Sequence, residues 1–162
     1  MLTRNYYNAH RAALAKTIIR DGFKDINGGT CDAGYFDIYV PSPFLSNVTF
    51  NSYGGILIGS GATPPTLDDY RLEAQITSGM TASNSRGFDE NGNPYTIITL
   101  TNASDKAITV REIGVVGSGY YNAGSSGSKN VLLDRTILES PITIEPGGVG
   151  QITYTIRMNY PT

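Results

Sequence analysis

Apolar residues recur with a helical period in the first part of the chain. Across residues 4–24, Tyr7, Leu14 and Ile18 stand seven and four positions apart, which places them on one face of a helix. Strong helix formers are frequent in the same stretch: Ala9, Ala12, Ala13 and Ala15. Gly22 and the pair Gly28-Gly29 are expected to end the regular part. The pattern therefore predicts one N-terminal helix over residues 4–24.

The side chains of this predicted helix indicate an assembly element. The alanines are small enough to pack closely against a flat partner, which is either the chain's own sheet or a neighbouring subunit. Arg11 interrupts the apolar stripe, although its aliphatic stem can still lie along apolar surface. We take the stripe as a candidate interaction surface, formed by Tyr7, Leu14 and Ile18.

From residue 30 onward, apolar and polar positions alternate with the two-residue period of β-strands. About eight short stretches are rich in β-forming residues, among them residues 35–40 and 48–50, and turn signals recur roughly every 8–12 positions. The alternation is cleanest in the last stretch, at Ile152, Tyr154, Ile156 and Met158. Such alternation indicates one buried and one wet face, as in an antiparallel sandwich.

These patterns predict a mostly-β fold with one N-terminal α-helix. We expect a helical segment over residues 1–29, followed by an antiparallel β-sandwich, jelly-roll or Ig-like, over residues 30–162. Residues 95–101 and 107–116 are separated by a turn and predict a hairpin. Residues 117–130 are mostly Gly, Ser, Tyr and Asn, and we expect a mobile loop there.

The expected loop carries Tyr120 and Tyr121 between small residues. Exposed tyrosines in such a setting are common in recognition surfaces, because a rigid ring gives contact area at little entropic cost. The rings could stack on a sugar, or they could pack back on the sandwich; the sequence leaves both open. Tyr120 and Tyr121 are therefore also candidate interaction residues.

The composition limits the classes of partner that we expect. Charged residues make up 16% of the chain and the formal net charge is −2, with no basic run, so we expect no nucleic-acid partner. No apolar run reaches the ~18 residues that span a bilayer, and we expect no membrane partner. The N-terminus lacks the apolar core of a signal peptide, which favours synthesis in the cytoplasm.

Candidate chemistry is sparse. His10 is the single histidine and Cys31 the single cysteine, so a Ser-His-Asp, Cys-His or zinc site lacks residues, and no intrachain disulfide can form. Asp89-Glu90-Asn91-Gly92-Asn93 spaces its oxygen side chains as calcium loops do, but Pro94 and Leu100 stand where an EF-hand needs Gly and Glu. Asn-Gly favours a hairpin turn there instead.

Paired carboxylates leave one catalytic alternative. Asp68 and Asp69 are adjacent and Glu73 follows a helical turn later, so a hydrolase using them is conceivable. We interpret them instead as the start of a single helical turn that Thr66 caps. The sequence thus predicts no catalytic, cofactor-binding or metal-binding residue, no cofactor, and no enzymatic activity.

Several segments in a fixed order resemble a family of tailed-bacteriophage virion proteins. They cover roughly residues 54–160: a strand, a small-residue turn with prolines and Asp-Tyr-Arg-Leu-Glu in residues 56–73, then residues 96–102, 108–114, 132–138 and 141–148. The resemblance implies a non-enzymatic virion component, made in the host bacterial cytoplasm and assembled in many copies with itself and other virion proteins. Head–tail connector or collar, tail and capsid-decoration roles stay open, and no site residue is carried over.

One alternative of a different class remains. A carbohydrate- or receptor-binding module of a phage attachment apparatus would use the tyrosine pair Tyr120-Tyr121 on a β-scaffold. Its partner would be a glycan. The sequence does not choose between this use and assembly.

Overall fold

The computed structural model describes residues 1–15, 18–33, 55–121 and 127–155. These residues form one helix and eight strands, which are, in chain order, α1 (Arg4–Ala15), β1 (Ile19–Lys24), β2 (Thr30–Ala33), β3 (Gly55–Gly59), β4 (Met80–Phe88), β5 (Pro94–Asn102), β6 (Ile108–Tyr121), β7 (Gly127–Ile144) and β8 (Val149–Thr155). The predicted mostly-β fold with one N-terminal helix is confirmed. The strands expected at 35–40 and 48–50, and the end of the last stretch at Ile156 and Met158, lie outside the described residues.

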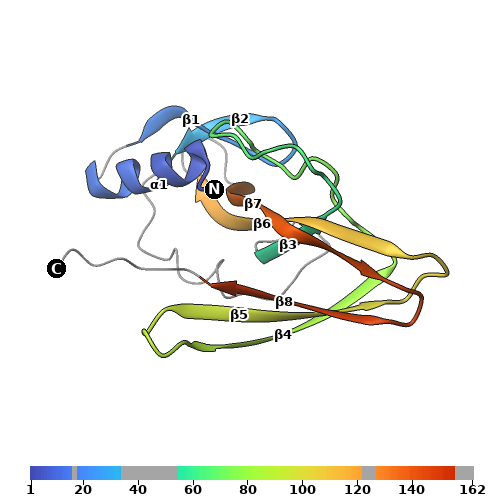
Figure 1. The fold of residues 1–162 in the computed structure, drawn as a ribbon. Coiled ribbons are helices and arrows are strands. Elements are labelled where there is room, and N and C mark those ends of the chain that lie inside the picture. The colour runs from blue at the N-terminus through green and yellow to red at the C-terminus, as the bar shows by residue number, and fades with distance from the viewer. Residues whose placement is uncertain (16–17, 34–54, 122–126, 156–162) are drawn as a thin grey trace.

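Two antiparallel sheets of three strands form the centre of the molecule, with strand orders β3-β6-β7 and β4-β5-β8. In Figure 1 the sheet β4-β5-β8 lies at the bottom and the sheet β3-β6-β7 lies above it. The helix α1 and the two-stranded sheet β1-β2 lie at the top. All pairings between the strands are antiparallel. This arrangement agrees with the predicted β-sandwich.

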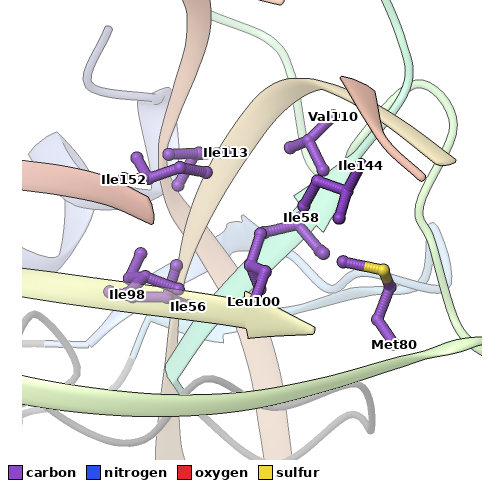
Figure 2. Close-up of a cluster of buried hydrophobic side chains, with 9 residues drawn as sticks. All are labelled: Ile56, Ile58, Met80, Ile98, Leu100, Val110, Ile113, Ile144 and Ile152. Carbon is purple, nitrogen blue, oxygen red and sulfur yellow. The ribbon is translucent and has the colours of Figure 1, made fainter. Parts of the chain in front are cut away.

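The main core fills the space between the two sheets. All six of their strands contribute buried apolar side chains to it, namely Ile56, Ile58, Met80, Ile98, Leu100, Val110, Ile113, Ile144 and Ile152. Figure 2 shows these side chains gathered between strands of both sheets. Burying one aliphatic side chain of this size contributes about 1.5–3 kcal/mol, so this cluster is the largest apolar contribution to stability.

Two smaller clusters extend the apolar interior. In one, Ala9 and Ala12 of α1 pack with Phe23 of β1 on β7, through Val131 and Leu133. In the other, Leu57 of β3 packs with side chains from β6, β7 and two loops: Leu72, Val116, Leu132 and, partly buried, Ile26. Since successive strand residues point to opposite faces, Leu57 lies on the face of its sheet opposite Ile56 and Ile58.

The predicted helix is wrong from residue 18 onward. Residues 19–24 form β1, which pairs with β2, so the segment 1–29 contains a helix followed by a strand. The register of this pair shifts between Ile19 and Phe23, where Asp21 has a φ of 48°. Positive φ is incompatible with a right-handed helix, and β-branched Ile19 favours a strand.

The predicted hairpin of residues 95–101 and 107–116 is wrong as well. β5 pairs with β4 and β8, whereas β6 pairs with β3 and β7, so the connection crosses from one sheet to the other. Asn102 is fully buried at this crossing, and its side-chain N–H group donates to the carbonyls of Lys106 (2.7 Å) and Ile144 (2.8 Å). The chain does turn after β5, but Asn102 binds the sheet β3-β6-β7 there, and the turn does not close a hairpin.

The stretch 117–130 is paired over most of its length instead of forming the expected mobile loop. β6 and β7 keep their register from Gly117↔Val131 to Tyr121↔Gly127, and residues 122–126 lie outside the described part. Strand pairing uses backbone groups, so small residues can take part in it. The composition of this stretch therefore misled the prediction.

Two hairpin turns share one hydrogen-bond pattern. Residues 25–29 close β1–β2 and residues 89–93 close β4–β5, and both read Asp-x-Asn-Gly-x. In each turn, the backbone N–H of the Asp donates to the carbonyl of the fifth residue, and the N–H of the fourth residue, Gly, donates to the Asp carbonyl. The Asp carboxylate accepts the backbone N–H groups of the third and fifth residues. Gly28 and Gly92 have φ values of 90° and 76°, a region that glycine enters without steric cost. The hairpin turn predicted at Asp89 is confirmed.

Candidate functional site

Residues 60–74 form a compact loop. It covers the outer face of the sheet β3-β6-β7, which is the face opposite the main core. Its ends meet where the Ser60 N–H donates to the Ala74 carbonyl at 2.8 Å. A loop of this length with closed ends is an Ω-loop, a type that often carries function. Leu72 anchors its underside on three side chains of the sheet, Leu57, Val116 and Leu132. We call residues 60–74 the Ω-loop below.

Arg135 of β7 is the centre of a charged cluster beneath the Ω-loop. Its side chain is 3% exposed, and Nε donates to Glu112 Oε2 at 2.7 Å while Nη1 donates to Asp69 Oδ2 at 2.9 Å. Glu73 Oε2 lies 3.4 Å from Nη2. The guanidinium carries five donors in a fixed planar fork, which suits it to several carboxylates at once. One side chain therefore joins β6 and β7 to two points of the Ω-loop.

Glu112 of β6 holds the Ω-loop through the backbone. Its side chain is fully buried, and besides Arg135 it accepts the N–H groups of Gly61 (3.1 Å), Ala74 (2.8 Å) and Glu73 (3.2 Å). Burying a carboxylate is costly unless it is paired and hydrogen-bonded. These four donors replace the lost water, so Glu112 is a stable acceptor at the base of the loop.

Glycines leave the space that Glu112 occupies. A Cβ atom placed on Gly59 or Gly61 would lie 2.5 Å from Glu112 Oε1. Such a distance is far inside van der Waals contact, so backbone or carboxylate would have to shift. Both glycines are thus part of the cluster although they carry no side chain.

The two Ω-loop carboxylates that face Arg135 are held in the charged form. Burial raises the pKa of Asp69, but hydrogen bonds from the Thr66 N–H, Arg135 and the Thr66 hydroxyl outweigh it and leave the pKa below its usual value. For Glu73, the Thr63 N–H and hydroxyl lower the pKa most, with smaller help from the Ala62 N–H and Arg135. Neither carboxylate is tuned toward the neutral pH range where general acid–base catalysis works best.

The predicted helical turn after Thr66 is not formed. The segment makes a turn in which the Asp69 N–H donates to the Thr66 carbonyl at 3.3 Å, while the Asp69 carboxylate accepts the Thr66 N–H and hydroxyl. Asp68 points elsewhere and pairs with Arg4 Nε at 2.6 Å. Asp68, Asp69 and Glu73 lie close in sequence, but each is bound to a cation.

Two shallow cavities of about 320 and 330 Å³ flank the Ω-loop, and Asp68, Asp69 and Tyr70 line both. The Lys24 ammonium lies 3.9 Å from the centre of the Tyr70 ring, a cation–π contact that covers one face of the ring. Within the described ranges, no three His, Cys, Asp or Glu side chains gather as potential metal ligands. The ion pair of Arg4 with Asp68 lines the first cavity, and the ion pairs of Arg135 with Asp69 and Glu73 line the second.

The helix α1 has one buried side and one exposed side. Ala9 and Ala12 are 6% and 0% exposed, so these alanines pack on the chain's own fold. Tyr7 and Leu14 are 51% and 86% exposed, and Ile18, just after the helix, is 41% exposed. Leu14 in particular is an apolar side chain left almost entirely in water. We call Tyr7, Leu14 and Ile18 the α1 stripe.

His10 and Cys31 lie in ordinary surroundings. His10 is exposed, with Nδ1 3.2 Å from the Tyr6 carbonyl and its ring 4.3 Å from the ring of Tyr6. Cys31 packs partly against the cluster of Ala9 and Phe23, and burial raises the pKa of its thiol, which opposes formation of a reactive thiolate. These positions agree with the interpretation of both as structural residues.

Tyr120 and Tyr121 are placed by their backbones alone. They pair with Ser128 and Gly127 at the described end of the β6–β7 hairpin, and their side chains lie outside the described part of the chain. Whether the rings face solvent, as the glycan interpretation needs, stays a prediction.

Sequence reasoning missed the two central residues, Glu112 and Arg135. Each stands beside another charged residue within a β-rich stretch, at Val110-Arg111-Glu112-Ile113 and Leu133-Asp134-Arg135-Thr136. A charged residue that falls on a buried face needs an opposite charge, and these two are of opposite sign. That pairing was the available signal, but the strand register needed to use it came from the structure.

Comparisons with protein-family models, with curated proteins and with solved structures give no match to this chain. Among the described residues, no helix is long and apolar enough to cross a membrane. Fold and site together define the class as an antiparallel β-sandwich with a helical attachment and a clamped Ω-loop. The resemblance to virion proteins is carried by the sequence segments alone.

Proposed function

We propose that this chain is a non-enzymatic structural component of a tailed-bacteriophage virion, assembled in many copies with itself and with neighbouring virion proteins. A head–tail connector or collar, a tail protein and a capsid-decoration protein all fit this proposal. The observation that carries it is the α1 stripe, where Leu14 is 86% exposed while the opposite alanines are buried.

The α1 stripe suits a protein contact. Tyr7 and Leu14 are exposed on one side of α1, and a large exposed apolar side chain such as Leu14 can anchor a protein contact. Arg11 lies between Tyr7 and Leu14 along the exposed side of α1, and Tyr and Arg are enriched at the energetic centres of interfaces. Ala9 and Ala12 already pack on the chain's own fold, so the exposed side of α1 is left for a neighbour.

The carboxylates near the Ω-loop support a role without catalysis. A hydrolase would need a free acid and base, but Asp69 and Glu73 are bound by Arg135, and Asp68 by Arg4. The pKa values of all three lie below their ordinary values, with hydrogen bonds as the main lowering cause. This favours assembly over hydrolysis as the function of the fold.

Replacement of Leu14 tests the proposal. We expect the purified protein to self-associate, or to bind a virion protein, and Leu14→Asp to weaken that association by about tenfold or more, because a buried interface anchor would become a charge. Sedimentation velocity over a concentration series measures it. The matched control is Phe88→Asp, since Phe88 is also an exposed apolar residue, 71% exposed, but lies on β4. A protein that stays monomeric and binds no capsid or tail partner would contradict the proposal, as would equal effects of the two variants.

Carbohydrate or receptor binding is the second candidate. It is favoured by the position of Tyr120 and Tyr121 at the described end of a long hairpin, where loops commonly carry recognition. Glycan-array binding that is lost in Tyr120→Ala and Tyr121→Ala, with unchanged self-association, would support it. Silence on the array together with unchanged adsorption of phage carrying these variants would exclude it.

A further inference from the structure

We propose that the Ω-loop is an acid-released strap: protonation of its carboxylates Asp69 and Glu73, which face Arg135, frees the loop from β3-β6-β7, while the sandwich formed by the two large sheets stays folded. The inference stands on the geometry of the charged cluster and does not depend on the virion proposal.

Charge pairing supplies most of the contacts that hold the strap. Three carboxylates face the one guanidinium of Arg135, namely Glu112 from β6 and Asp69 and Glu73 from the loop itself. Glu112 also binds three backbone N–H groups of the loop. Glu73 accepts the N–H groups of Ala62 and Thr63, which hold the shape of the loop itself. Leu72 is the one apolar side chain of the loop buried in the sheet's cluster. Neutralising Asp69 and Glu73 therefore weakens both ion pairs between the loop and Arg135, together with hydrogen bonds that keep the loop's shape.

The remaining charged groups near the strap lie on its outer side. Asp68 faces Arg4 of α1 at 2.6 Å. Lys24 of β1 lies over the Tyr70 ring at 3.9 Å, and the Arg71 guanidinium lies 5.5 Å from the same ring. These contacts are at exposed side chains, where ion pairs contribute little. They do not substitute for the cluster beneath the loop.

The direction of the pH effect follows from the carboxylates. The pKa values of Asp69 and Glu73 are lower in the folded chain than their ordinary values. A group with a depressed folded pKa contributes stability above its unfolded pKa, about 4 for these side chains, and that contribution is lost as the pH falls through the folded value. The strap is thus closed at neutral pH and opens below about pH 4.

The main core has no comparable dependence on pH. Its nine clustered side chains are aliphatic or thioether groups that do not titrate. Acid therefore removes the attachments of the strap before it affects the contacts between the sheets. Opening the strap takes Leu72 off the sheet and uncovers apolar side chains that it now covers: Leu57, Val116 and Leu132.

Hydrogen exchange with mass spectrometry tests the order of events in the full chain. Labelling from pH 7 to pH 3, corrected for the intrinsic exchange rate at each pH, is followed in peptides of the Ω-loop and of β5. We expect loop amides such as those of Ala62, Thr63 and Ala74 to lose protection while β5 stays protected, with a parallel rise in the fluorescence of an apolar dye. Loss of protection in both peptides at one pH would overturn the proposal.

A pair of variants separates the cluster from the rest of the loop. Glu73→Gln removes one charge that faces Arg135, and we expect loop amides to exchange about tenfold faster at pH 7, the effect of losing one charge-assisted hydrogen bond. Asp68→Asn is the control, because Asp68 lies in the same loop but pairs with Arg4 instead. Equal exchange in the two variants would also overturn the proposal. The pH series on the unmodified chain keeps the test valid if Glu73→Gln does not fold.

Discussion

At the residue scale, four hydrogen-bond donors offset the cost of burying the carboxylate of Glu112. Glu112 is fully buried, yet Arg135 and three N–H groups of the Ω-loop satisfy its oxygens. Replacing a whole buried pair by apolar residues can be neutral, whereas removing one partner leaves the other charge stranded. The cluster is therefore sensitive to single substitutions out of proportion to its size.

Glu112→Gln is expected to destabilise the fold by about 3–5 kcal/mol, because it breaks a buried ion pair while keeping the shape of the side chain. Urea denaturation monitored by far-UV circular dichroism measures the change. Glu139→Gln, at an exposed position of β7, is the matched control and should change stability by less than about 0.5 kcal/mol. Similar losses in the two variants would show that the cluster is not special.

At the element scale, repeated local chemistry decides where strands turn. The Asp-x-Asn-Gly-x turns at 25–29 and 89–93 use the same backbone and carboxylate hydrogen bonds, although one joins the small sheet and the other a large one. The second was predicted from Asn-Gly, and the same signal at Asn27-Gly28 was available to mark a hairpin within the expected helical segment 1–29.

Asp89→Ala is expected to destabilise the fold by about 1–2 kcal/mol, because two backbone N–H groups lose their acceptor. Thermal unfolding checks the shift. Glu90→Ala changes a neighbouring exposed carboxylate in the same turn and serves as control. If both variants unfold at the same temperature, the Asp carboxylate does not stabilise the turn.

Features that depend on interactions between residues close in the chain could be predicted from the sequence, and features that depend on distant residues could not. The alternation at Ile152 and Tyr154 and the single helix were readable from the sequence, because pattern and propensity act within a few residues. The pairing of β5 with β8 was not, since the two strands lie far apart in the chain, and neither was the contact of Asn102 with Ile144 across 42 positions. Arg135 was missed for the same reason: its partners lie 23, 62 and 66 positions away. Long-range pairing requires the sheet topology, which no local pattern contains.

At the scale of the whole molecule, the sandwich and the helical attachment have separate apolar clusters. The main core joins β3–β8, whereas α1 and β1 rest on one patch of β7 through Ala9, Ala12 and Phe23. Regions with few buried contacts open more easily than the core does. Hydrogen bonds of Thr3 and Asn5 to the Leu132 carbonyl also hold the attachment, and we expect it to open before the sandwich does.

Ala12→Leu is expected to push α1 away from β7 and to cost about 1–3 kcal/mol, because Ala12 is fully buried and a larger side chain overpacks the site. Hydrogen exchange should rise in α1 and β1 and stay low in β5. Ala15→Leu adds the same atoms at an exposed end of the helix and should have little effect. Uniform loss of protection throughout the chain would mean that attachment and sandwich unfold together.

The two glycines beside Glu112 have a consequence for how this sequence can change over time. Gly59 and Gly61 leave room for the carboxylate, and the carboxylate in turn binds the backbone there. A side chain at either glycine would also meet the loop itself, at the Ala74 carbonyl oxygen (2.7 Å from a Cβ on Gly59) or at Glu73 Cβ (2.5 Å from a Cβ on Gly61), and a smaller residue at position 112 leaves Arg135 without its nearest anion. Among related sequences, Gly59, Gly61, Glu112 and Arg135 should therefore be retained together.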